Sequence, residues 1–275
     1  MTKSNKKCYY NNYQEIISFF LNTQQHCQHL FAVVSWGCCA TSWLSKVLNF
    51  HPEIMCLHNF LVGFTEIDNR NAEDYMRAIY ITSYPYLVAG DVHGVPRDAI
   101  PYLQEQFGSH FSAVTLVRDP YHRFFSMLSA VRWNQGMDND YSYIDDLVDR
   151  LGIDIPLTWD NRMLIHAANM LNAIIDEKKL VGDRIYRMED LVKNKEKLSE
   201  LIQDISNNLI IPDEEWLDSA IAIKPINSHR KKLKEQILLS SQEKEVVLTV
   251  FDKKAQTIYE NLGYDIEEFI KKFQL

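Results

Sequence analysis

A strand, a tight turn and a helix are predicted in succession between residues 30 and 52, and this stretch constrains the fold more than any other. Residues 30–36 form a continuous apolar run, which is typical of a strand buried on both faces. Residues 37–40 are small, so backbone amides can approach a bound group, and residues 41 and 42 favour a helix start. The pair His51-Pro52 ends the predicted helix. A loop of amides that leads into a helix N-terminus is a site for an anion such as phosphate.

The composition favours a soluble α/β protein. The chain has 275 residues, of which 46% are hydrophobic and 24% charged, enough for one large domain. No run approaches the roughly 18 apolar residues of a transmembrane helix, and the N-terminal residues do not resemble a signal peptide. We therefore expect a cytoplasmic, single-domain protein with an N-terminal extension over residues 1–29 and a core over about residues 30–266.

Charge and cysteine content argue against several other classes. The formal net charge of −8 disfavours a nucleic-acid-binding protein, and it also disfavours an acidic polysaccharide such as a glycosaminoglycan as the molecule acted on. The five cysteines are odd in number and lack paired spacing, so neither a disulfide framework nor a zinc site is expected. We expect no metal, no nucleic-acid partner and no membrane partner. The sequence leaves open whether the protein forms a homodimer.

A second informative stretch covers residues 111–126. Residues 114–117 form an apolar strand, and Asp119-Pro120 is typical of a helix start. Arg118 stands between them, and Ser126 follows it by eight residues. A guanidinium offers a fixed fork of donors to a phosphate, and a hydroxyl adds another. The alternative is a surface ion pair between Arg118 and Asp119.

Two histidines follow predicted strands. His93 comes after the buried run at residues 86–92, and His58 comes after the short run at residues 54–57. Open α/β sheets bind ligands outside the carboxyl ends of their strands, which favours a functional role for His93 over a structural one. For His58, a surface or core histidine is the stronger interpretation.

Together these motifs resemble sulfotransferases that use 3′-phosphoadenosine 5′-phosphosulfate (PAPS). That family reads roughly Pro-Lys-Ser-Gly-Thr-Thr-Trp-Leu, then Leu-Asn-x-His-Pro; this chain has Gly-Cys-Cys-Ala-Thr-Ser-Trp-Leu at 37–44 and Leu-Asn-Phe-His-Pro at 48–52. The Arg-Asp-Pro motif with its later Ser matches residues 118–126, and the catalytic His of Lys-Thr-His-x-x-Pro matches His93, with Asp91 in place of the Lys. Weaker matches cover residues 189–191 and 261–265. The Gly-Lys-Ser/Thr ending of a nucleoside-triphosphate loop is absent.

The resemblance implies one three-layer α/β domain with a central, mainly parallel sheet flanked by helices, in the P-loop-NTPase-like sulfotransferase fold. It implies transfer of a sulfonyl group from PAPS to a hydroxyl or amine, leaving PAP, with His93 as general base and His58 as the second candidate. We expect the acceptor to be a small polar, even cationic, natural product of secondary metabolism. The residues expected to hold the cofactor are Gly37, Cys38, Cys39, Ala40, Thr41, Ser42, Trp43 (stacked on adenine), Arg118, Ser126, Arg230 and Lys231.

One departure from the family leaves alternatives open. The family has Lys or Arg where this chain has Cys38. Another cation among Lys46, Arg123 and Lys231 could reach the site, the helix N-terminus could suffice, or the protein could bind PAP with little or no catalysis. A carbohydrate or lipid acceptor is a further alternative.

Four expectations concern the remaining chain. Residues 132–158 are acidic and aromatic, and we expect them to be the least regular part and to lie near the acceptor. A helix is predicted from residue 160 and a strand within residues 181–187, followed by a helix start at which Glu189 is a scaffold group. One helix is predicted over residues 241–262, with Gly263 as its stop.

Overall fold

A five-stranded parallel sheet forms the centre of the computed structural model, which describes residues 26–35, 39–58, 69–133, 141–224 and 237–274. The strands are β1 (His29–Val33), β2 (Ile54–His58), β3 (Val88–Val92), β4 (Phe111–Val117) and β5 (Ile185–Arg187). Their order is β2-β3-β1-β4-β5, and every neighbouring pair is parallel. All five strands therefore end at one edge of the sheet, which we call the carboxyl edge.

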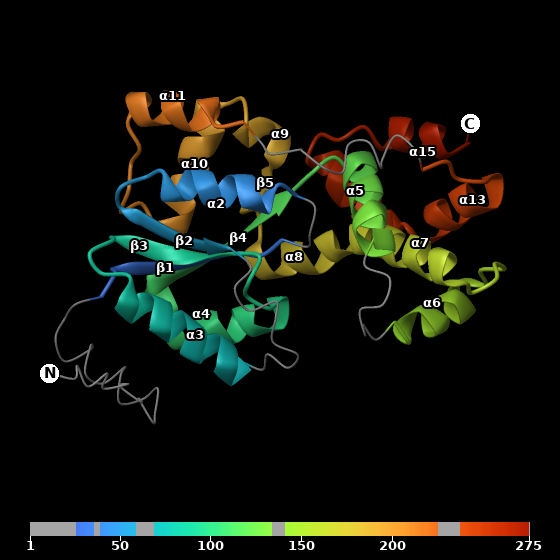
Figure 1. Ribbon diagram of the computed structural model, residues 1–275, viewed down its shortest axis with the longest axis horizontal. Helices are drawn as coiled ribbons and strands as arrows, with labels where there is room; N and C mark the ends of the chain where they lie inside the picture. The colour runs from blue at the N-terminus through green and yellow to red at the C-terminus, as the bar shows by residue number, and fades with distance from the viewer. Residues whose placement is uncertain (1–25, 36–38, 59–68, 134–140, 225–236, 275) are drawn as a thin grey trace, which may run out of the picture.

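Helices cover both faces of this sheet, so the predicted three-layer α/β architecture is confirmed (Figure 1). One face packs against α2 (Thr41–Asn49), α9 (Met188–Leu191), α10 (Lys195–Ile205) and α11 (Glu214–Ala222). The other face packs against α3 (Asn69–Thr82), α4 (Ile100–Phe107) and α8 (Ile174–Val181). Short 3₁₀ turns occupy Arg97–Ala99, Gly108–His110 and Met170–Ala173.

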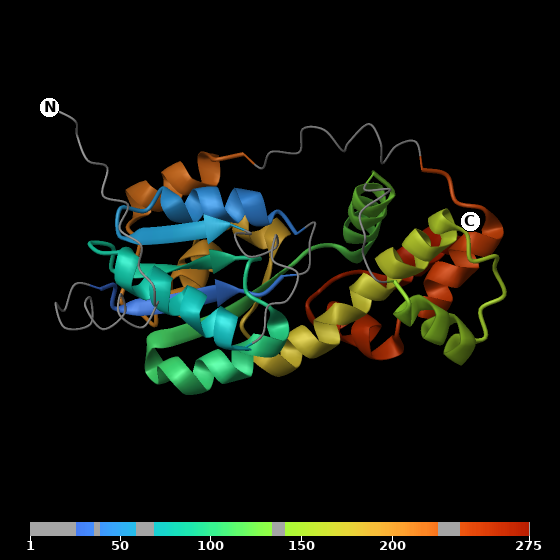
Figure 2. The same ribbon diagram turned by 60° about the horizontal axis from the view of Figure 1, so that its bottom comes forward.

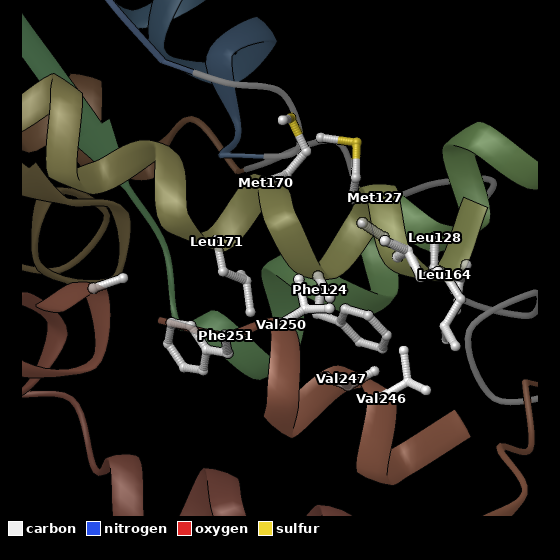
Figure 3. Close-up of a cluster of buried hydrophobic side chains, with 14 of the residues drawn as sticks. Phe124, Met127, Leu128, Leu164, Met170, Leu171, Val246, Val247, Val250 and Phe251 are labelled. Carbon is white, nitrogen blue, oxygen red and sulfur yellow. The ribbon is translucent and has the colours of Figure 1, made fainter. Parts of the chain in front are cut away.

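The other helices form a group of their own beyond the carboxyl edge (Figures 1 and 2). They are α5 (Pro120–Trp133), α6 (Tyr143–Leu151), α7 (Trp159–Asn169), α13 (Ser241–Val250), α14 (Lys253–Asn261) and α15 (Ile266–Gln274). Figure 3 shows their shared core, in which Phe124 from α5, Leu164 from α7 and Val247 from α13 are fully buried. The site is therefore bounded by a sheet on one side and by a helical group on the other.

The sheet packs tightly because its strands carry small and branched residues. β1, β3 and β4 are buried along their whole length. Gly90 in β3 lies so close to β1 that an added Cβ would stand 2.1 Å from the Phe31 carbonyl oxygen. Only glycine fits at this position, because a contact that short would force the two strands apart.

Three sequence expectations need correction. The helix predicted over residues 241–262 is two helices, because Asp252 accepts from the Lys254 N–H (2.7 Å) and starts α14. The acidic stretch at 132–158 contains α6, whose buried face includes Leu147. The packed core also extends past residue 266, since Phe269 and Phe273 are 2% and 3% exposed.

In the described parts of the chain, no helix has both the length and the apolar character needed to cross a membrane. The division into a 29-residue extension and one domain stays a prediction, although Cys27 and His29 are already part of the buried core.

Candidate functional site

The carboxyl edge brings the predicted site residues into a row. β2 ends at His58, β3 is followed by His93, β4 is followed by Arg118, and β5 ends at Arg187. The register pairs His58 with Val92, so the two histidines leave adjacent strands side by side. The chain leaving β1 lies between the histidines and the arginines, because β1 is flanked by β3 and β4.

The exit of β1 is fixed to β4 by three hydrogen bonds. The Val34 N–H donates to the Val114 carbonyl (2.8 Å), and the Thr115 hydroxyl donates to the Val34 carbonyl (2.8 Å). The Ser35 hydroxyl donates to the Leu116 carbonyl (2.9 Å). The start of the predicted anion loop is therefore held in one position.

The far end of the loop turns sharply into α2. Ala40 precedes the helix in a left-handed conformation, with φ 59° and ψ 31°. It stands where the resembled family has glycine, the residue that adopts this conformation without steric cost. Among the residues that the structure describes, no side chain caps α2, and the first N–H groups of a helix have no partner within it. The amides of Thr41 and Ser42 are therefore suited to an anion.

His93 is held in a geometry that suits a proton acceptor. Its φ is 73°, its N–H donates to the Val33 carbonyl (3.0 Å), and its Nδ1 lies in hydrogen-bond contact with the Ser35 carbonyl oxygen. A carbonyl only accepts, so Nδ1 carries the proton. In the neutral ring, Nε2 then keeps its lone pair.

A buried carboxylate lies beneath this histidine. Asp91, which replaces the family's lysine, is 0% exposed and accepts a hydrogen bond from the Tyr75 hydroxyl. Burial and the Asp91 charge raise the pKa of Tyr75 far above its usual value, so it remains a donor. An added Cβ on Gly94 would stand 2.4 Å from Asp91 Oδ1, so glycine lets the backbone after His93 rest on the carboxylate.

His58, the exposed last residue of β2, contacts the start of α2. Its Nε2 lies 3.1 Å from Thr41 Oγ1 and 3.4 Å from Ser42 Oγ. Burial lowers the pKa of His58, the neighbouring His93 lowers it further, and Asp91 acts in the opposite direction. The imidazole is therefore neutral at pH 7 in this structure.

The predicted Arg118–Ser126 pair is brought together. Arg118 Nη1 lies 3.4 Å from Ser126 Oγ, and Ser126 is 3% exposed. The backbone beside Arg118 is held by Glu189, which accepts from the Asp119 N–H (3.1 Å) and from the Tyr264 hydroxyl (2.8 Å). The predicted scaffold position of Glu189 thus joins three distant parts of the chain.

A pocket of about 350 Å³ opens beside this pair. Its lining includes four basic side chains and two carboxylates: Arg118, His122, Arg187, Lys193, Asp119 and Glu189. The Arg187 guanidinium lies 4.4 Å from the centre of the Tyr264 ring, which orients it. Sequence analysis did not identify Arg187 or Lys193, because neither belongs to a motif; the position of Arg187 at the end of a predicted strand was the available signal.

Trp43 lies in the core. It is 2% exposed, and its indole N–H donates to the Ile223 carbonyl (2.6 Å). Stacking of adenine on Trp43 stays a prediction, and it would require the neighbours of the indole to move aside.

Two of the three proposed substitutes for the missing loop lysine lie in the described part of the chain, one enclosed in the core and the other at the far end of α2. Arg123 is 0% exposed, donates to the Tyr259 hydroxyl (2.8 Å) and lies 3.6 Å from Glu177. Lys46 is exposed in the last turn of α2. Four predicted site residues lie outside the described part of the chain: Gly37, Cys38, Arg230 and Lys231.

Within the described ranges, no group of three or more His, Cys, Asp or Glu side chains is arranged to hold a metal ion. The expected absence of a metal stays a prediction.

Comparison with known proteins gives a distant structural likeness. No protein-family model and no curated protein matches the chain. Among solved structures, the mouse sulfotransferase SULT7A1 complexed with PAP is similar at 14% identity and a TM-score of 0.43. The match covers 89% of this chain and 88% of that chain. A TM-score at this level carries no functional argument.

Proposed function

We propose that this protein is a sulfotransferase that moves a sulfonyl group from PAPS to a hydroxyl or amine of a small polar acceptor. The observation that carries the proposal is the order of groups along the carboxyl edge. A base candidate, an amide-rich helix start and an Arg–Ser pair follow one another in space: His93, the start of α2, and Arg118 with Ser126. This succession fits a donor with phosphate groups at two positions, next to an acceptor that must lose a proton.

The residues present fit such a donor. The amides and hydroxyls of Thr41 and Ser42 would hold the 5′-phosphosulfate, where the α2 dipole also favours negative charge. Arg118 and Ser126 would hold the 3′-phosphate by charge-assisted hydrogen bonds. The adjoining pocket of about 350 Å³ supplies space and further basic groups.

In the reaction, the acceptor oxygen or nitrogen forms a bond to sulfur, and the bond from sulfur to the bridging oxygen breaks. PAPS supplies the activated sulfonyl group, and the electron pair of the broken bond stays on the phosphate. His93 takes the acceptor proton at Nε2, because Nδ1 is engaged with the Ser35 carbonyl. The amides of α2 stabilise the charge that develops on the phosphate.

The acceptor is the least determined part of the proposal. Among the described residues, the histidine side of the edge has a buried carboxylate, Asp91, and the chain is acidic overall. A neutral or cationic acceptor fits this environment better than a polyanion does.

The test is binding of adenosine 3′,5′-bisphosphate, measured by calorimetry and thermal shift beside AMP and Mg·ATP. At about 100 times its dissociation constant the bisphosphate should stabilise the protein by about 2.7 kcal/mol, whereas AMP at the same concentration should stabilise it much less. Selective stabilisation by Mg·ATP would overturn the proposal.

A second candidate function is binding of PAP without transfer. It is favoured by Cys38 in place of the family's cation and by the enclosure of Arg123. Bisphosphate binding without sulfonyl transfer to phenols, amines or sugar alcohols would select it.

A further inference from the structure

We propose that His58 serves as a proton-linked cation beside the 5′-phosphosulfate, in place of the lysine that the loop lacks. This inference rests on the proposed function and assigns His58 a role different from that of a general base. On donor binding, His58 takes up a proton, and its charge is then held against the phosphosulfate by the hydroxyls at the start of α2.

His58 contacts two hydroxyls at the proposed phosphosulfate site. Nε2 is 3.1 Å from Thr41 Oγ1 and 3.4 Å from Ser42 Oγ, two hydroxyls of the helix start that would hold the 5′-phosphosulfate. Neither hydroxyl caps α2. A protonated Nε2 donates to these oxygens, so both hydroxyl protons are free to donate to the anion.

The groups around His58 decide whether its imidazole is neutral or charged. Without ligand, burial and the neighbouring His93 favour the neutral imidazole. The titratable and charged groups that face it from the described neighbouring elements are His93 and Asp91 on β3, and Cys56 on its own strand. Tyr75 on α3 reaches the same carboxylate. Asp91 already favours the cation, and an arriving phosphate adds a second negative charge.

The two histidines therefore differ in which nitrogen is engaged. In His93, Nδ1 is bound to a carbonyl and Nε2 keeps a lone pair for the acceptor proton. In His58, Nε2 itself is engaged with the hydroxyls of α2. His93 thus suits the base, and His58 suits a charge that positions and stabilises the phosphosulfate.

The decisive experiment measures the affinity of adenosine 3′,5′-bisphosphate between pH 6.5 and pH 8.5. In the unaltered protein we expect binding to be about fivefold to tenfold tighter at the lower pH, because a neighbouring anion raises the pKa of an imidazole by about a unit or more. Calorimetry in buffers of different ionisation enthalpy should show net proton uptake on binding. Adenosine 3′-monophosphate, which has no 5′-phosphate, should show a much flatter pH dependence.

The matched variants isolate His58. His58→Gln keeps a neutral donor near the hydroxyls, and it should lose the pH dependence while retaining binding at pH 8.5. His110→Gln is the control, since His110 precedes β4 at the opposite edge of the sheet and is exposed. It should behave as the unaltered protein does. Titration of the ligand's own phosphates is common to all these proteins and therefore cancels in the comparison.

Nuclear magnetic resonance titration of the His58 ring gives an answer that does not depend on a variant folding. Its pKa should lie below 6.5 in the free protein and rise when the bisphosphate binds. An unchanged His58 pKa, or equal pH dependence in the unaltered protein and His58→Gln, would overturn the inference and leave the sulfotransferase proposal standing. Failure of the bisphosphate to bind at any pH would overturn both.

Discussion

The two halves of the carboxyl edge are built from different chemistry. The half formed by β2 and β3 ends in two histidines above a buried carboxylate, His58, His93 and Asp91. The half formed by β4 and β5 ends in arginines next to a pocket, Arg118 and Arg187. Imidazole is the side chain that generally exchanges protons near neutral pH, whereas guanidinium groups are generally permanent cations. Fixed cations suit the holding of phosphate, and titratable groups suit the reaction.

The largest expected effect comes from the histidine half. His93→Asn should lower kcat about 100-fold to 10,000-fold, because a general base contributes that much. Asparagine tolerates the left-handed backbone at this position, so the fold should persist. Bisphosphate affinity should change little. A variant that keeps its turnover would remove His93 as the base.

The arginine half is tested by Arg118→Ala. Loss of a charged donor to phosphate costs about 2–3 kcal/mol, which corresponds to roughly 30-fold to 150-fold weaker bisphosphate binding. AMP has no 3′-phosphate, so its affinity should change much less. Arg150→Ala, at an exposed position in the last turn of α6, is the matched control. Equal losses for both nucleotides would contradict the placement of the 3′-phosphate.

A substitution that removes the hydrogen bond between Tyr264 and Glu189 should weaken nucleotide binding less than Arg118→Ala does. Tyr264→Phe removes the hydroxyl that donates to Glu189 at 2.8 Å, which loosens the backbone beside Arg118. We expect bisphosphate binding to weaken about threefold to tenfold, as loss of one hydrogen bond of roughly 1 kcal/mol implies. Tyr84→Phe, at a side chain that is 57% exposed, should have no effect. If Tyr264→Phe lowered kcat and left bisphosphate affinity unchanged, the assignment of phosphate binding to the arginine half and of proton transfer to the histidine half would be wrong.

The loop between the halves gives the smallest effect. Ala40→Gly should stabilise the protein by on the order of 1 kcal/mol, since alanine is strained at φ 59° and glycine is not. Thermal unfolding should shift upward by about 2–4 °C. Ala130→Gly, in the interior of α5, should shift it downward. A lower melting temperature for Ala40→Gly would mean that the left-handed turn is absent.

The sequence was sufficient for the strands that end at the site and for the contact between Arg118 and Ser126. Apolar runs bounded by polar residues predicted β1 to β4, because local periodicity is recorded in a single sequence. The pairing of Arg118 with Ser126 came from the resemblance to the family's Arg-Asp-Pro motif.

Contacts between distant residues were not accessible in the same way. Asp91 and Tyr75 are adjacent only because α3 packs on the sheet, and Glu189 meets Tyr264 across 75 positions of the chain. Trp43 matched the family's motif but lies in the core, since hydrophobic burial against the α10 side of the sheet decided its position. The break between α13 and α14 had a visible signal in Asp252, a good N-cap residue.

The bond between Glu189 and Tyr264 also sets an order of assembly during synthesis. The elements that support the histidine half, β1 to β4 with α2 and α3, all precede Tyr264 in the chain and leave the ribosome before it. The backbone beside Arg118 gains its last support from Tyr264, close to the C-terminal end of the chain. A chain that ends before Tyr264 would have the histidines of the site, but its phosphate-binding half would lack the hydrogen bond that supports the backbone beside Arg118.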